Sequence, residues 1–342
     1  MTRTKTPNKR DSSNFISSGS TLFNLALSDD AHCGFKKGTL VNIVGDSSAG
    51  KTFLALTGLV TAIQDDVDRK YTYIYDDVES ANQFDMPKLF GKFAEEIEKP
   101  PLEKYSNTIE DLFDNVMHLL EEDIPFIYVV DSFDALDSEE DMQNFKKSRK
   151  EKKAGKKPSG SYRMAKPKKA SEMFRRICNK LEHTQSILIV ISQTRDAIGT
   201  MFKKKTRSGG RALKFYSAHE VWLAVEKTLI SKKRMIGTKT RSRTKKNQIT
   251  GKWRDSPLYF YYSYGVDDVR ANIEFLVQEK YWKKIKKTIK AKEFDAEGTV
   301  TTIIHHIEGV DGEERLQELV GKKWMEIENS LIDSDRKPRF EG

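Results

Sequence analysis

Short apolar runs alternate along this chain with longer amphipathic segments. The runs are rich in Val, Ile and Tyr and are bounded by polar or glycine-containing turns, as buried strands are. They lie at residues 39–44, 71–75, 125–131, 186–192, 220–225 and 258–262. Segments with a helical pattern lie between or before them, at residues 22–27, 53–63, 107–121 and 171–183. Apolar strands that alternate with helices predict an α/β fold with a mostly parallel central sheet.

The pattern divides the chain into three parts. Residues 1–14 are expected to be a flexible basic arm, residues 15–268 hold the predicted sheet, and residues 269–342 shift to charged helices that predict a small C-terminal domain with an acidic end. No apolar segment reaches the roughly 18 residues that a membrane span needs, and the arm lacks the apolar run of a signal peptide. Cys33 and Cys178 have no metal-ligand spacing and are expected to be reduced thiols. These features predict a soluble cytoplasmic protein with no membrane partner.

Charge is distributed unevenly over the 342 residues, whose net charge is +9. Residues 146–169 contain twelve Lys or Arg and one acid, residues 227–254 contain eleven and no acid, and residues 293–342 contain thirteen acids against six bases. A single charged run is usually a solvated face, but two basic runs that flank the fourth apolar strand predict a surface for a polyanion. Residues 145–170 are rich in Lys, Gly, Pro and Ser and are expected to form an exposed, disordered loop.

The turn after the first apolar strand has the spacing of a phosphate-binding loop. It reads Gly45-Asp46-Ser47-Ser48-Ala49-Gly50-Lys51-Thr52 and leads directly into a predicted helix. In a strand–loop–helix arrangement of this kind, backbone N–H groups and the helix N-terminus surround phosphate oxygens. Lys51 is expected to reach the β- and γ-phosphates of ATP, and the Thr52 hydroxyl is expected to bind Mg²⁺. The alternative is an ordinary Gly/Ser turn, which the flanking strand and helix disfavour.

Polar residues that follow the other apolar strands are candidates for ATP hydrolysis. Asp131 ends the third strand and is expected to organise the Mg²⁺ shell. Glu79, shortly after the second strand, is the preferred carboxylate for orienting the attacking water, although Asp76 and Asp77 compete for that role on spacing alone. Gln193 follows the fourth strand, where it either contacts the γ-phosphate or caps the strand.

Two segments carry a more specific pattern. Residues 190–202 read Val-Ile-Ser-Gln-Thr-Arg-Asp-Ala-Ile-Gly-Thr-Met-Phe, and residues 209–216 read Gly-Gly-Arg-Ala-Leu-Lys-Phe-Tyr. They resemble the strand, the second DNA-binding loop and the loop exit of the RecA family of homologous recombinases. Other stretches are similar to the same family in the same order, at residues 16–20, 45–52, 129–132, 240–247 and 264–266. The resemblance covers residues 15–268 and implies a RecA-like P-loop ATPase core.

The resemblance also implies roles for individual residues at the nucleotide. Lys51 and Thr52 would bind the triphosphate and Mg²⁺, and Asp131 would be the Walker B acid. Glu79 would be the catalytic glutamate, and Gln193 would be the sensor that reports the γ-phosphate to the DNA-binding loop.

The resemblance extends to contacts between subunits. Lys246 resembles the first of two lysines that reach across the subunit interface to the neighbour's ATP, while Gln248 stands where the second would be. Phe215 resembles a residue at the inter-subunit junction. The arm of residues 1–14 is too short for the N-terminal polymerisation helix of bacterial members, so filament contacts are expected to differ.

Two DNA-binding loops are implied, at residues 145–170 and 194–211. Basic side chains in them can neutralise phosphates without reading sequence, and Met201 and Phe202 can stack on bases. The candidate DNA-binding residues are Arg163, Arg195, Met201, Phe202, Lys203, Lys204, Lys205, Arg207, Gly209, Gly210 and Arg211.

These features lead to the hypothesis of an ATP- and Mg²⁺-dependent DNA strand-exchange protein. It would form filaments on single-stranded DNA, pair with a homologous duplex, and meet single-strand-binding and loader proteins. A divergent, phage-encoded member acting in a bacterial or infected-host cytoplasm, at the nucleoid, would explain the departures from the bacterial pattern. Two alternatives remain open: a hexameric helicase motor of the same superfamily, and a non-catalytic mediator that binds ATP and single-stranded DNA.

Overall fold

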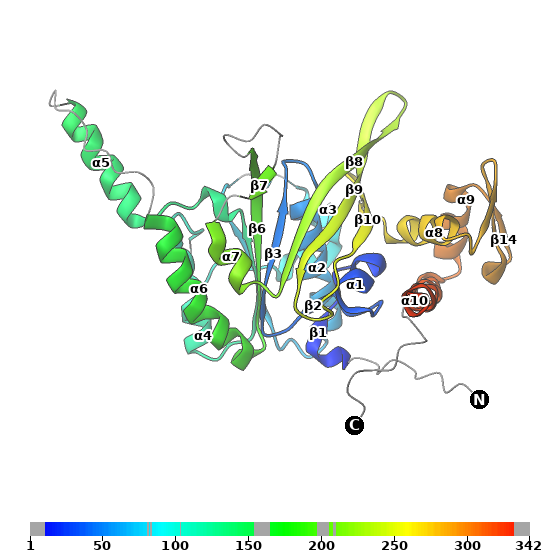
Figure 1. Cartoon of the computed structure of the whole chain (residues 1–342), viewed down its shortest axis with the longest axis horizontal. Helices are drawn as coiled ribbons and strands as arrows, with labels where there is room; N and C mark the ends of the chain where they lie inside the picture. Colours follow the sequence, from blue (N-terminus) through cyan, green and yellow to red (C-terminus); the bar gives the residue numbers. More distant parts are fainter. Residues whose placement is uncertain are drawn as a thin grey trace.

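A nine-stranded mixed sheet forms the centre of the molecule (Figure 1). The computed structural model describes residues 11–80, 82, 84–102, 104–153, 165–196, 205–207 and 210–331. The strands are β3 (Thr39–Gly45), β4 (Thr72–Asp77), β5 (Phe126–Asp131), β6 (Ile187–Asp196), β7 (Lys205–Arg207), β8 (His219–Ser231), β9 (Arg234–Asn247), β10 (Asp255–Tyr261) and β11 (Gly265–Val266). Their order is β11-β10-β9-β8-β3-β6-β5-β4, with β7 paired to β6. Strands β4, β5, β6, β3 and β8 are parallel, which confirms the predicted parallel sheet.

Helices cover both faces of the parallel strands because successive side chains of each strand point to opposite faces. In β3, Val41 and Ile43 pack on the face covered by α2 (Lys51–Asp65). Leu40 packs on the other face, which is covered by three helices. These are α4 (Ile109–Glu121), α6 (Ala165–Thr184) and α7 (Gly210–Tyr216). The predicted helices at 53–63, 107–121 and 171–183 are confirmed within these elements.

The expected loop at residues 145–170 is wrong over much of its length. Helix α5 spans Glu139–Lys153, and α6 begins at Ala165. The first turn of α5 is acidic and its last turn is basic, a distribution that stabilises a helix through its dipole. Lysine is a good helix former, so a lysine-rich composition does not by itself predict a loop. Helix α5 has no buried residues and projects from the body of the molecule (Figure 1).

Strand β9 lies within the second basic run, where no strand was predicted. Its hydroxyl residues Thr238, Thr240, Ser242 and Thr244 are buried, and the positions between them are all Lys or Arg. This alternation matches the two-residue period of a strand with one face buried. Because the buried face is made of Thr and Ser rather than aliphatic residues, the run lacks the apolar alternation from which a strand is predicted.

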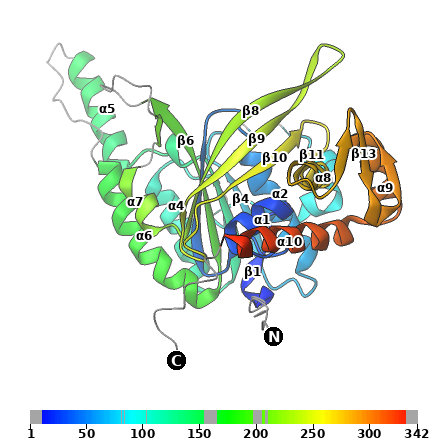
Figure 2. The same ribbon diagram turned by 45° about the vertical axis from the view of Figure 1, so that its right-hand side comes forward.

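The segment after β11 contains helices and a small sheet. The helices are α8 (Asp268–Gln278), α9 (Val300–Gly309) and α10 (Glu313–Ser330), and the strands are β12 (Lys283–Ile285), β13 (Thr288–Ala291) and β14 (Ala296–Gly298). The predicted charged helices are therefore confirmed, whereas the three strands were not predicted, because they are too short and too polar to stand out in the sequence. Residues of this segment share a core with α1 (Thr21–Ser28), which contributes Leu22 and Leu25. Figure 2 shows α10 running alongside α1.

The amino-terminal part of the described chain is short but structured. Residues Ser12–Asn14 form a 3-10 turn, and β1 (Phe15–Ile16) pairs with β2 (Phe35–Lys36). Both cysteines are free, as expected. Within the ranges that the structure describes, no helix is both long and apolar enough to span a membrane.

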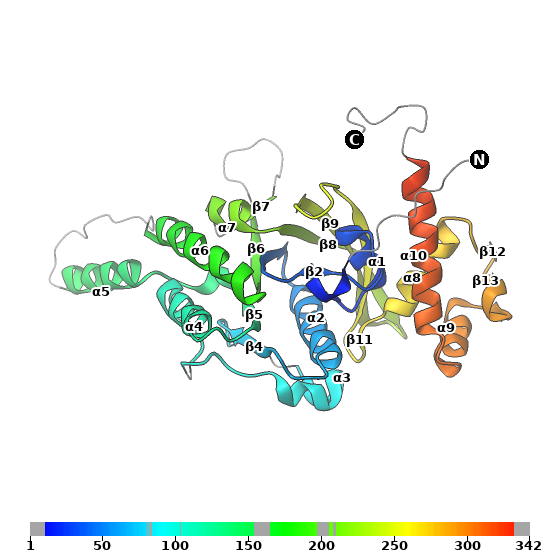
Figure 3. The same ribbon diagram turned by 90° about the horizontal axis from the view of Figure 1, so that it is seen from below.

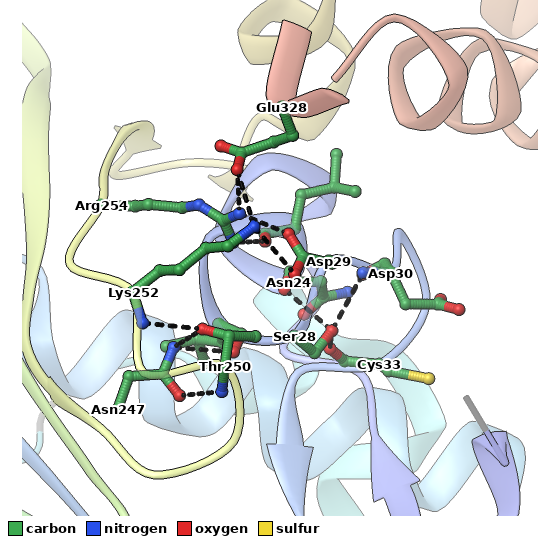
Figure 4. Close-up of polar contacts among 12 residues, drawn as sticks. Asn24, Ser28, Asp29, Asp30, Cys33, Asn247, Thr250, Lys252, Arg254 and Glu328 are labelled. Carbon is green, nitrogen blue, oxygen red and sulfur yellow. Dashed lines mark hydrogen bonds and ion pairs between the residues drawn. The ribbon is translucent and has the colours of Figure 1, made fainter. Parts of the chain in front are cut away.

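Four charged residues tie α10 to the core. Arg254 lies 2.5 Å from both Asp29, at the end of α1, and Glu328, in α10. Lys252 lies 2.9 Å from Glu328 and 3.6 Å from Asp29. Figure 4 shows Lys252 and Arg254 converging on the two carboxylates, and we call Asp29, Lys252, Arg254 and Glu328 the clasp.

Candidate functional site

The predicted phosphate-binding loop connects the carboxyl end of β3 to the first residue of α2. Two of its residues, Ser48 and Gly50, have left-handed backbone conformations with φ of 61° and 88°. A Cβ atom at Gly50 would lie 2.3 Å from the ring of Phe260, so both the conformation and the space require glycine there. Since the N-terminus of α2 opens directly onto this loop, its unpaired N–H groups and helix dipole favour an anion.

Lys51 is buried at the start of α2, with 9% of its surface exposed. Its ammonium group donates a hydrogen bond to the backbone oxygen of Asp46, at 2.7 Å. Burial lowers the pKa of Lys51, while the carboxylates of Asp131, Glu79, Asp46 and Asp134 act in the opposite direction. The lysine is therefore held within its own loop by a carbonyl oxygen, an acceptor that a phosphate oxygen can replace.

Thr52 and Asp131, which are expected to bind Mg²⁺, contact each other directly. The Thr52 hydroxyl donates to Asp131 Oδ2 at 2.5 Å, and the Tyr75 hydroxyl donates to the same oxygen at 3.1 Å. Burial raises the pKa of Asp131, and the two hydroxyl donors partly offset that rise.

The donor set fits a magnesium ion that is shared with phosphates. A hydroxyl and a carboxylate next to a phosphate-binding loop are the oxygen ligands that Mg²⁺ takes when substrate phosphates and water complete its shell. In the described part of the chain, no group of three or more His, Cys, Asp or Glu residues could hold a metal alone. Thr52 and Asp131 would therefore hold Mg²⁺ together with a nucleotide.

Glu79, the carboxylate expected to orient the attacking water, lies between the ends of β5 and β6. It accepts hydrogen bonds from Gln193 Nε2, at 2.9 Å, and from the Ser132 hydroxyl. Its two competitors have other partners. Asp76 is buried among Ser106 and Tyr128, whose hydroxyl groups donate to it, and burial raises its pKa.

Asp77, the other competitor, accepts the backbone N–H of Asn82. It lies beside Asp131 in the register of β4 and β5. Of the three acids, Glu79 is the one for which a hydrogen bond to Gln193 is seen, and this contact favours Glu79.

Gln193 joins the nucleotide site to the next segment of the chain. It pairs with Gly45, the first residue of the phosphate-binding loop, in the parallel register of β6 and β3. Its backbone N–H donates to Asp134, and the hydroxyl group of its neighbour Thr194 donates to Asp46. The end of β6 is thus attached to both the phosphate-binding loop and the turn after β5.

Several of these partners were missed by the sequence analysis. Ser132 and Asp134 lie one and three residues after Asp131, and Tyr75 lies in β4 just before Asp76. Their position next to a strand end was the available clue. The sequence does not show which of several polar residues in such a turn face the site, because that depends on the turn geometry; here it includes a cis peptide bond between Asp131 and Ser132.

The structure covers only part of the expected DNA-binding residues. Arg195 lies in β6, Lys205 and Arg207 lie in β7, and Gly210 and Arg211 begin α7. Strand β7 pairs antiparallel with the end of β6, so the segment that follows Gln193 begins as a short two-stranded ribbon. Six predicted residues lie outside the described residues: Arg163, Met201, Phe202, Lys203, Lys204 and Gly209.

Lys246 and Phe215 lie apart from the phosphate-binding loop of the same chain. The ammonium group of Lys246 donates to the backbone oxygens of Lys214, at 2.9 Å, and Phe215, at 2.7 Å. These oxygens lie near the end of α7, which packs on the sheet face opposite α2. Phe215 is 73% exposed, so this end of α7 presents an apolar side chain at the surface.

Comparisons with known proteins agree with this geometry. The family model for the RecA N-terminal domain matches residues 4–267. The RecA protein of Corynebacterium aurimucosum is 25% identical over 270 residues, which cover 79% of this chain and 66% of that protein. The RecA protein of Halalkalibacterium halodurans is 24% identical over 274 residues, with coverages of 78% and 72%. This chain thus spans about two thirds of the length of the first of these relatives.

The fold also has a relative of known structure. The crystal structure of the RadB recombinase superposes with a TM-score of 0.50 at 15% sequence identity, and the match covers 74% of this chain and 99% of the other. At this identity the likeness supports the fold alone.

Proposed function

Because this chain belongs to the RecA N-terminal domain family, we propose that it is an ATP-dependent recombinase that forms filaments on single-stranded DNA and exchanges strands with a homologous duplex. The observation that carries the proposal is the hydrogen bond between Gln193 and Glu79, at 2.9 Å. It links the carboxylate best placed for hydrolysis to the strand that leads into the expected DNA-binding loop. A plain ATPase has no need of such a connection, whereas a protein whose DNA binding depends on ATP requires one.

Each residue of the site has a task in this proposal. Lys51 binds the β- and γ-phosphates, and the N–H groups of the loop from Gly45 to Gly50 surround the phosphate oxygens. Bound at Thr52 and Asp131, Mg²⁺ would neutralise charge on the phosphate oxygens. Glu79 orients the attacking water and accepts its proton.

Gln193 acts as the sensor in the same proposal. Its amide group donates to Glu79, and a γ-phosphate oxygen would offer it a second acceptor. A change of partner would move the end of β6 and hence the ribbon that β7 forms with it. The DNA-binding loop at residues 194–211 would thereby respond to ATP.

DNA and a second copy of the chain are the proposed partners. The basic residues of segments 145–170 and 194–211 would contact the phosphates of single-stranded DNA, and Met201 and Phe202 would stack on its bases. Lys246 and the exposed Phe215 would face a neighbouring copy, with ATP at the interface between them. The setting would be a bacterial or phage-infected cytoplasm.

The test combines imaging with a strand-exchange assay. The protein is incubated with single-stranded DNA and Mg-ATP, imaged for filaments, and assayed for joint molecules with a homologous duplex. Lys51→Ala should abolish ATP hydrolysis and ATP-dependent filaments, whereas the exposed Lys36→Ala serves as the matched control. Fork unwinding without joint molecules would show a helicase instead, and DNA binding with no ATP hydrolysis by the unmodified protein would show a non-catalytic mediator.

A further inference from the structure

The hairpin of β8 and β9 extends beyond the rest of the sheet. Pairing between β3 and β8 ends at Leu223, and pairing between β10 and β9 ends at Gly237. Beyond these residues the ladder continues between β8 and β9, up to the last pair, Ser231 with Arg234, and one further contact joins the backbone N–H of Tyr262 to the backbone oxygen of Ile236. Figures 1 and 2 show this ribbon projecting from the same end of the sheet as β7. We call residues 230–236 the ribbon tip.

The turn at the ribbon tip is made of two lysines in an unfavourable conformation. Lys232 and Lys233 have φ of 47° and 63°, the pair of left-handed conformations found in a type I′ hairpin turn. Asn-Gly is the preferred sequence for that turn, because side chains with a bulky Cβ substituent are disfavoured at positive φ. Two lysines at these positions are therefore not explained by folding, and such strain is a reason to look for a function.

The ribbon tip is both cationic and apolar. Lys232, Lys233 and Arg234 are exposed, and in the described part of the chain no carboxylate lies within ion-pairing distance of any of them. Ile230 and Met235 are directly opposite each other in the ladder, so they share one face, and they are 67% and 48% exposed. The tip thus presents three free cations around an apolar pair.

We propose that the ribbon tip binds duplex DNA. The major groove of B-DNA admits a two-stranded ribbon, with phosphates on both sides of it. Lys232, Lys233 and Arg234 would contact those phosphates, while Ile230 and Met235 would contact thymine methyl groups or a base step. The inference rests on the proposed function in expecting a duplex as the second DNA partner, and it assigns that partner a surface separate from the segments at 145–170 and 194–211.

Other anionic partners fit the tip less well. A membrane surface needs a broad apolar face, and two side chains provide little apolar area. The acidic segment at residues 293–342 of a second copy matches the charge but gives no reason for an apolar pair. Both remain as measurable outcomes of the test.

The turn allows a test in which charge is removed without harming the fold. K232N/K233G installs the preferred turn sequence, so the thermal unfolding midpoint of the full-length chain should stay the same or rise. Duplex affinity is measured by fluorescence anisotropy without nucleotide, between about 50 and 200 mM salt. Loss of two phosphate contacts should reduce the change in affinity over this range by about tenfold. K88Q/K92Q, which removes the same charge from exposed sites elsewhere, should leave the salt dependence unchanged.

A second variant isolates the apolar pair. I230S/M235S should weaken duplex binding at every salt concentration and keep the salt dependence of the unmodified protein, because no phosphate contact is lost. Duplex binding by K232N/K233G that equals that of the unmodified protein would overturn the proposal. So would a loss of self-association, in sedimentation, or of binding to anionic vesicles, with duplex binding intact.

The outcome is separable from that of the proposed function. Duplex binding is measured without ATP or single-stranded DNA, whereas the proposed function is tested by joint molecules. An unmodified protein that makes no joint molecules but shows the effect of K232N/K233G would contradict the recombinase proposal and support the ribbon tip. If K232N/K233G instead binds duplex DNA as the unmodified protein does and makes joint molecules at the normal rate, the ribbon-tip proposal is contradicted and the recombinase proposal is supported.

Discussion

The clasp and the nucleotide site both contain buried charged groups, but only the clasp is balanced. In the clasp two cations meet two carboxylates, and Arg254, with 8% of its side chain exposed, contacts both acids (Figure 4). At the nucleotide site one buried lysine faces four carboxylates, those of Asp131, Glu79, Asp46 and Asp134. Figure 3 shows how the two regions lie on separate elements, α10 beside α1 and the phosphate-binding loop before α2.

The difference distinguishes a charge cluster that stabilises the fold from one whose net charge suits a bound cation. A buried charge needs partners of opposite sign, and the clasp supplies all of them from within the chain. The surplus of carboxylates at the nucleotide site repels further negative charge, including a triphosphate. A divalent cation that arrives with the nucleotide removes that surplus, so the imbalance itself predicts Mg²⁺ dependence.

The largest expected effect comes from removing one surplus charge at the nucleotide site. Glu79→Gln keeps the size of the side chain but not its basicity, and kcat for ATP hydrolysis should fall by about 10² to 10⁴-fold. The free energy of unfolding should not fall, because a repulsive carboxylate is lost. Asp77→Asn is the matched control and should retain most activity. Equal losses in the two variants would contradict the assignment of Glu79.

Removing one of the two cations of the clasp should lower the stability of the protein and leave its ATPase activity unchanged. Arg254→Ala leaves two carboxylates without their buried partner and should lower the free energy of unfolding by about 3–5 kcal/mol, measured with urea. Lys252, 45% exposed, contributes a screened contact, and Lys252→Ala should cost no more than about 1 kcal/mol. ATP affinity should not change in either variant. An Arg254→Ala protein as stable as Lys252→Ala would show that the clasp does not hold α10.

The surplus of carboxylates at the nucleotide site can also be tested by comparing ATP binding with and without Mg²⁺. ATP with Mg²⁺ at about 100 times its Kd should stabilise the protein by about 2.7 kcal/mol, whereas ATP with a chelator should stabilise it less. Asp131→Asn removes a surplus charge and a metal ligand together, so the difference between the two conditions should shrink. Thermal unfolding measures both effects, and an unchanged difference would show that Asp131 does not hold the metal.

The smallest effect concerns the pH dependence of the clasp. Burial alone would raise the pKa of Glu328, but hydrogen bonds and charge from Arg254 and Lys252 outweigh burial and hold the pKa below its ordinary value of 4.5. A carboxylate with a lowered pKa contributes stability above its unfolded pKa and loses it as the pH falls through the folded pKa. Stability should therefore decline below about pH 4.5, and less steeply in Glu328→Gln. Parallel acid unfolding curves for the two proteins would contradict this linkage.

Much of the nucleotide site could be predicted because it lies at strand ends. Gly45, Glu79, Asp131 and Gln193 each end or follow an apolar strand, and the carboxyl ends of parallel strands meet at one edge of the sheet. The clasp could not be predicted, since Asp29 and Glu328 are far apart in the sequence and only the folded chain brings them together.

The second basic run, residues 227–254, is another region whose contacts could not be predicted from the sequence. It was interpreted as one polyanion-binding surface, but its residues have different environments. Arg243 pairs with Asp255 at 2.7 Å, and Arg254 is buried in the clasp. Among the described residues, the three cations of the ribbon tip, Lys232, Lys233 and Arg234, form no ion pair. Charge along a sequence does not show which carboxylates fold back onto it.

The ring of Phe260 connects β10 to the phosphate-binding loop through direct packing. It belongs to β10, which pairs with β9 at the root of the ribbon, and it lies against both Gly50 and Phe53. Close-packed interiors transmit displacement because they contain no free volume to absorb it. A load on the ribbon that shifts β10 must therefore press this ring against the phosphate-binding loop or pull it away. Binding of DNA at the ribbon tip would in this way change the affinity of the phosphate-binding loop for ATP through β10.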